Sequence, residues 1–85
     1  MNDRLVTEVL GSYANGNKIW LVVRNPDVTK QFDKFVEPQE NPNLLKGLKP
    51  GDWVLLKGKE VKGRSFLAIS CEKIYKEKVI DVFGE

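Results

Sequence analysis

A tryptophan and an arginine on one side of a strand-like segment are the side chains of this chain best suited to hold a ligand. Residues 18–24 read Lys-Ile-Trp-Leu-Val-Val-Arg, and alternate side chains of an extended segment point to opposite faces. Trp20 and Arg24 therefore share one face. The aliphatic side chains share the other face, which suits a protein interior: Ile19, Leu21 and Val23. An indole offers a surface for stacking, and a guanidinium binds phosphate. The alternative for Trp20 is a position in the core.

A second group of candidates lies later in the chain, around an expected turn. Four cations with one opposing acid, Glu60, make this the densest basic feature: Lys57, Lys59, Lys62 and Arg64. Phe66 follows on the polar side of its segment, where it is a candidate for stacking or for a lid over the interior. Lys18 and Tyr13 flank an earlier turn and are weaker candidates. The alternative for the cations is a solvated turn.

Two more phenylalanines, Phe32 and Phe35, lie three residues apart, so a regular strand cannot expose both on one face. We expect one of them in the core and at least one beside Trp20. Lys30 and Lys34 are placed to flank that ring, with ordinary solvated lysines as the alternative.

Composition removes most catalytic options. The chain has no histidine and one cysteine, so it lacks His-activated nucleophiles, the common zinc sites and an internal disulfide. Cys71 alternates with Leu67 and Ile69 and is read as a small buried hydrophobe. No glycine-rich phosphate loop and no catalytic carboxylate pair is apparent. We therefore expect a binding protein without catalytic activity, cofactor or metal.

The net charge of +2 is unevenly distributed. Residues 43–76 carry eight basic and three acidic side chains, whereas residues 1–42 and 77–85 are slightly acidic. This block predicts a localised positive surface, the property that matters for binding a polyanion. No apolar run is long enough to cross a bilayer, and no signal-like core follows Met1, so we expect a cytoplasmic protein with no membrane association.

Strand-like runs separated by turn residues dominate the chain. The predicted strands cover residues 5–14, 18–24, a stretch within 28–37 for which a short helix is the alternative, 53–59 and 64–75. One helical turn is expected at Asn43–Leu48. Gly11 inside the first strand predicts a bulge or bend, which a long strand needs to serve both halves of a small barrel. In the last strand Leu67, Ile69 and Cys71 are expected to face away from Phe66 and its alternating neighbours.

Residues 48–58 resemble the start of the fourth strand in OB-fold domains of the replication protein A, single-strand DNA-binding protein and anticodon-binding kind. They read Leu48-Lys49-Pro50-Gly51-Asp52-Trp53-Val54-Leu55-Leu56-Lys57-Gly58. Gly51-Asp52 would make the turn, Val54 and Leu56 would enter the barrel, and Gly58 would leave room where strands close on each other. Trp53 is expected to shield the barrel end. The resemblance implies an all-β, five-stranded OB-type Greek-key barrel over residues 1–76, with a very short helical connector between strands three and four. Residues 77–85 are expected to form a C-terminal tail or an additional edge segment.

The function implied is non-catalytic binding of single-stranded nucleic acid, DNA favoured over RNA, in replication, repair or recombination. OB proteins generally bind across strands two and three, flanked by the first hairpin and the loop between strands four and five. The main alternative is a protein-interaction OB module, a small subunit of a nucleic-acid-processing complex. Apolar residues within 77–85 would then bind a protein partner or form a homodimer. A third possibility is another all-β class, such as an SH3-like barrel.

Overall fold

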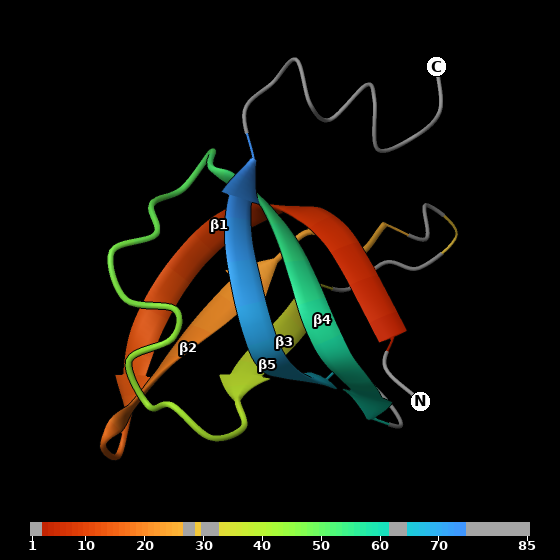
Figure 1. The fold of residues 1–85 in the computed structure, drawn as a ribbon. Helices are drawn as coiled ribbons and strands as arrows, with labels where there is room; N and C mark the ends of the chain where they lie inside the picture. Colours follow the sequence, from red (N-terminus) through yellow and green to blue (C-terminus); the bar gives the residue numbers. More distant parts are fainter. Residues whose placement is uncertain (1–2, 27–28, 30–32, 62–64, 75–85) are drawn as a thin grey trace.

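Five strands account for most of the residues that the structure describes. The computed structural model describes residues 3–26, 29, 33–61 and 65–74, and Figure 1 shows its strands curling around one interior. The strands are β1 (Asp3–Asn15), β2 (Lys18–Val23), β3 (Lys34–Pro38), β4 (Trp53–Val61) and β5 (Ser65–Ile74). The predicted all-β barrel is confirmed. The predicted boundary at residue 76 and the tail at 77–85 lie outside the described residues. None of the described residues forms a helix long and apolar enough to cross a membrane.

The strands close into a barrel in the order β1-β2-β3-β5-β4, with β4 returning to β1. All neighbours are antiparallel except β3 and β5, which are parallel. β1 is long enough to pair with β4 through residues 3–8 and with β2 through residues 9–15. The register shifts between Val9 and Gly11, which confirms the irregularity expected at that glycine. One bent strand therefore joins the two halves of the sheet.

The interior is filled by side chains that alternate inward along the strands. Val54 and Leu56 of β4 are fully buried, as the Gly51-Asp52 turn and the apolar alternation predict. Leu21 and Val23 are fully buried on β2, so the aliphatic face of that strand is the inner one. The fully buried Leu45, from the connector between β3 and β4, joins the same cluster.

The connector differs from the expected helical turn. Residues 42–47 form successive turns rather than a helix. The Leu44 N–H donates to the Asn41 carbonyl at 3.0 Å, an i to i+3 bond typical of a turn. The Asn41 side chain also accepts the Asn43 N–H at 3.0 Å, which stabilises the first of these turns. Burial of Leu45 therefore needs only turns to position it.

The prediction of which β5 side chains point into the barrel was also wrong. Lys57 of β4 pairs with Ser70, but Gly58 pairs with Ala68, so Ile69 is an extra residue on β5. This bulge brings Phe66 and Ala68 inward at one end of the strand while Cys71 packs against the core at the other. The bulge lies beside Gly58, whose absent Cβ would fall 1.8 Å from the Leu67 carbonyl oxygen. The room that we expected Gly58 to leave is confirmed.

Candidate nucleic-acid interface

The outer face of β2, β3, β5 and β4 carries mostly apolar side chains. The strand pairings align two rows of residues across it, Val22–Phe35–Ser65–Val61 and Glu37–Leu67–Lys59. All of these side chains are partly buried except Lys59, which is exposed. Apolar residues on the outside of a small barrel lie where water would favour polar ones, and a partly exposed apolar surface of this kind is a candidate binding site.

Trp20 extends this face toward β1. It alternates with the buried Leu21 and does not belong to the core cluster, so its side chain points outward as the sequence pattern predicts. The Tyr13 ring lies against it, with centroids 6.1 Å apart and planes tilted by 35°. The two-residue turn at Gly16-Asn17 pairs Asn15 with Lys18, which puts Tyr13 directly opposite Trp20. A turn centred on Asn15-Gly16 would put Tyr13 opposite Lys18 instead, so the Asn-Gly signal alone does not give the observed register. The pairing with Trp20 makes Tyr13 a stronger candidate than its place beside the turn indicates.

Phe35 is the phenylalanine that lies on the same face as Trp20. It pairs with Val22, while its neighbours Lys34 and Val36 point into the barrel and are buried. Trp20 lies two residues before Val22, so it is diagonal to Phe35 across the two strands. Residues in this relation lie about 7–8 Å apart. The expectation that one of the two phenylalanines accompanies Trp20 is thus satisfied by Phe35. Phe32 and Lys30 lie outside the described residues.

Two predicted members of the site lie elsewhere. Phe66 is fully buried in the core, so its proposed stacking role is wrong, and the bulge at Ile69 is the reason. Lys34 does not flank Phe35 in solvent. It is buried at the barrel end, 8% exposed, and its ammonium forms an ion pair with the Glu60 carboxylate.

Arg24 shares the outward side of β2 with Trp20 but is distant from it. The two residues are four positions apart, about 13 Å along an extended strand. Arg24 Nε lies 3.3 Å from Glu8 Oε1, with 62% of the arginine side chain exposed. The Arg24 N–H also donates to the Glu8 carbonyl at 3.0 Å. The guanidinium is therefore positioned by β1 and is not stacked beside the indole.

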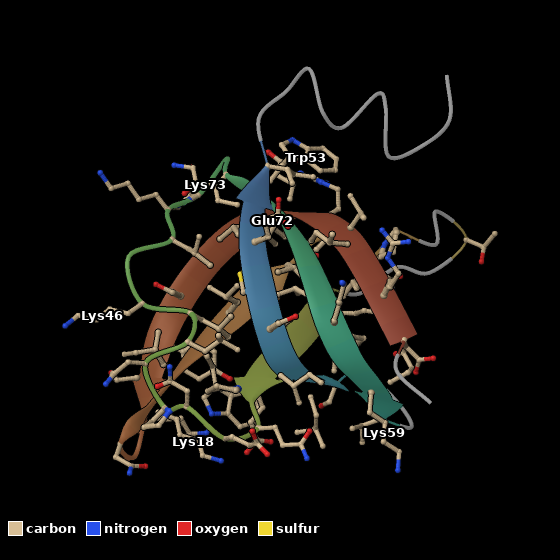
Figure 2. All side chains as sticks on the ribbon, in the orientation of Figure 1. Lys18, Lys46, Trp53, Lys59, Glu72 and Lys73 are labelled. Carbon is tan, nitrogen blue, oxygen red and sulfur yellow. The ribbon has the colours of Figure 1, made fainter. Side chains whose placement is uncertain are left out.

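Cations lie at one end of the outer face. Figure 2 shows Lys18 and Lys59 at the same end of the barrel, where the β1–β2 turn and the end of β4 are found. Lys18 Nζ lies 2.9 Å from Glu37 Oε2. Lys57 and Lys59 are exposed on β4, and within the described part of the chain neither forms an ion pair. The candidates Lys62 and Arg64 lie outside the described residues.

A separate pocket lies at the opposite end, where Figure 2 places Trp53. It has a volume of about 250 Å³ and is lined mainly by Val6, Glu8, Arg24, Pro26 and Trp53. Its lining is largely apolar. Trp53 pairs with Glu8 on one side and with Ile74 on the other, and it is partly buried. It therefore covers the outside of the barrel at this end and also forms a wall of the pocket.

Two ionisable groups of the described residues, Asp52 and Cys71, have shifted pKa values. The Lys49 N–H donates to Asp52 at 2.9 Å, and together with the nearby Lys73 ammonium it lowers the pKa of that carboxyl. Burial raises the pKa of the Cys71 thiol to about 11, so the thiol stays protonated at neutral pH. No three Cys, Asp or Glu side chains of the described residues gather as a metal site.

Comparison with protein-family models, with curated proteins and with solved structures found no match to this chain.

Proposed function

We propose that the chain is an OB-fold domain that binds single-stranded nucleic acid, DNA in preference to RNA, without catalysing a reaction. The strand order supports this assignment, since OB barrels are five-stranded and bind ligands across strands two and three. The absence of histidine from the whole sequence supports a non-catalytic role. Replication, repair or recombination is the setting in which such a domain acts.

The observation that carries the proposal is the row of ring and apolar side chains on the outside of β2 and β3. Trp20 and Phe35 point away from the barrel on neighbouring strands, and Tyr13 supports the indole from β1. Bases of any sequence stack on aromatic faces, each contact contributing about 1–3 kcal/mol. Ring-bearing residues at diagonal positions, with a backbone spacing of about 7–8 Å, suit successive bases of an extended strand.

The cations supply the second half of the interaction. Lys57 and Lys59 lie exposed on β4, and Lys59 aligns through Leu67 with Glu37 at the edge of the aromatic face. A strand whose bases lie on Trp20 and Phe35 has its phosphates within reach of these ammonium groups. Lys62 and Arg64, which follow β4 in the sequence, are proposed to continue this phosphate contact. Arg24 is proposed to contact a phosphate at the far end of β2.

The test is a titration of labelled 12-mers of dT, rU and a DNA duplex at several salt concentrations. We expect dT to bind most tightly and the duplex least. The slope of log affinity against log salt should be about −3.5, since each of the five proposed phosphate contacts on a single strand contributes roughly −0.7. No binding of dT at low salt, or equal binding of the duplex, would overturn the proposal.

The Trp53 pocket favours a second candidate, a protein-interaction module. The pocket is largely apolar and lies at the opposite end from Lys18 and Lys59. Its proposed occupant is the segment 77–85 of a second copy, which offers Val79, Ile80, Val82 and Phe83 to an apolar pocket. Size-exclusion mass measurement separates the two functions. If the parent chain is a dimer, and both deletion of residues 77–85 and Trp53→Ala make it monomeric, this candidate is supported. A parent chain that is monomeric at all concentrations contradicts it.

A further inference from the structure

Glu37 is the residue that the proposed binding surface does not explain. Its carboxylate lies on the outward side of β3, two positions after Phe35, with 28% of its side chain exposed. A carboxylate repels the phosphates of a nucleic acid, so this face would bind a strand better without it. The position of Glu37 makes sense if the group contacts bases instead.

Glu37 belongs to a donor–acceptor pair beside Trp20. Its Oε2 lies 2.9 Å from Lys18 Nζ, and Lys18 shares the outward side of β2 with Trp20. Because Leu21 pairs with Val36, continuing that register by one residue puts Glu37 opposite Trp20. The indole therefore has Tyr13 on its β1 side and Glu37 on its β3 side. The edge of a base stacked on the indole would meet the carboxylate and the ammonium.

The hydrogen-bonding pattern of the pair selects among bases. A carboxylate offers only acceptors and an ammonium offers only donors. The guanine edge presents two neighbouring donors, N1–H and the 2-amino group, next to the O6 acceptor. Cytosine and adenine each present one amino donor beside a ring-nitrogen acceptor. Thymine presents a single N3–H between two carbonyl oxygens, which a carboxylate repels.

We propose that Glu37 and Lys18 read the edge of the base stacked on Trp20, with guanine preferred and thymine disfavoured. Glu37 accepts from N1–H and the 2-amino group, and Lys18 donates to O6. The inference rests on the proposed single-strand binding and adds a base preference to it. Both side chains are about two-thirds buried, 33% and 28% exposed, so they are held in place yet reachable.

The test compares the affinities of labelled d(TTTG)₃, d(TTTI)₃, d(TTTC)₃ and dT₁₂ for the full chain at one salt concentration. We expect d(TTTG)₃ to bind at least about five-fold more tightly than dT₁₂, the lower end of the discrimination given by a bidentate base contact. Inosine lacks the 2-amino group, so d(TTTI)₃ should lose most of that advantage. d(TTTC)₃ should bind between the guanine and thymine strands.

Glu37→Gln is the diagnostic variant, and Glu8→Gln is its matched control. Both remove one negative charge from a carboxylate that pairs with a cation, but Glu8 contacts Arg24 at the other end of β2. We expect Glu37→Gln to bring the ratio of d(TTTG)₃ to dT₁₂ affinity close to one. Glu8→Gln should leave that ratio unchanged.

The possible failures are distinguishable. Equal binding of all four strands by the parent chain overturns the base preference and leaves single-strand binding intact. Binding of none of them overturns both. A guanine preference that survives Glu37→Gln overturns the assignment to this pair.

Discussion

Phe35 and Phe66 show how little residue type alone says about a role. Both are phenylalanines of neighbouring strands, and Phe66 pairs with Val36, the residue after Phe35. Phe66 is fully buried among the aliphatic core, whereas Phe35 points outward. Position relative to the barrel wall, rather than aromatic character, decides which ring is available to a ligand.

Substituting each ring by alanine should separate stability from binding. Phe66→Ala removes a buried ring and should lower the free energy of unfolding by about 3–5 kcal/mol, measured by urea denaturation. Phe35→Ala removes a partly buried ring, so it should lower the free energy of unfolding by less than Phe66→Ala does, and it should weaken dT₁₂ binding by about 1–3 kcal/mol. A Phe35→Ala variant that is strongly destabilised yet binds normally would show that the ring is structural.

Cys71 should be an inert thiol whose burial makes stability fall at high pH. Burial raises its pKa from 9.0 to about 11, so the folded state favours the neutral thiol. The resulting stability is fully present below pH 9 and is lost as pH rises toward 11, because the unfolded chain releases the proton first. We expect a thiol reagent at pH 8 to react much more slowly with the folded chain than with the chain in denaturant. Equal rates would contradict this.

At the scale of elements, the ion pair of Lys34 and Glu60 ties the start of β3 to the end of β4. Lys34 is 8% exposed, whereas 47% of the Glu60 side chain is exposed. Asp3 of β1 accepts the Glu60 N–H at 2.9 Å, so three strands meet at this barrel end. The two members of the pair differ in how much their desolvation costs.

This asymmetry predicts unequal effects of removing each partner. Glu60→Ala leaves a buried ammonium without its carboxylate and should lower the free energy of unfolding by about 1–3 kcal/mol. Lys34→Met leaves a half-exposed carboxylate that water solvates, so its cost should be smaller. Chemical denaturation of both variants checks this, and a larger loss for Lys34→Met would contradict the assigned burial.

The sequence was sufficient where a signal is local. Gly11, the Asn15-Gly16 turn and the Gly51-Asp52 turn fix the ends and bends of strands, and the outward phase of Trp20 follows from its aliphatic neighbours. It was insufficient where a residue's environment comes from another strand. The bulge at Ile69 depends on the close approach of Gly58 to Leu67, which alternation within β5 cannot reveal. The partners of Arg24 and Lys34 likewise come from β1 and β4.

At the scale of the whole molecule, the barrel presents two distinct surfaces. The aromatic face has Lys18 and Lys59 at its edge, and the Trp53 pocket lies at the other end. The net charge of +2 is too small to hold a polyanion by itself, so binding must combine stacking with local cations. Each surface contains one of the two tryptophans of the chain.

That distribution allows the most direct test of single-strand binding on the outer face of β2 and β3. In a Trp53→Phe variant only Trp20 fluoresces, and in a Trp20→Phe variant only Trp53 does. Adding dT₁₂ should quench the Trp20 emission and raised salt should restore it, while Trp53 emission should stay nearly constant. Quenching of Trp53 alone, or bound oligonucleotide with an unchanged Trp20 signal, would contradict the assignment of this face.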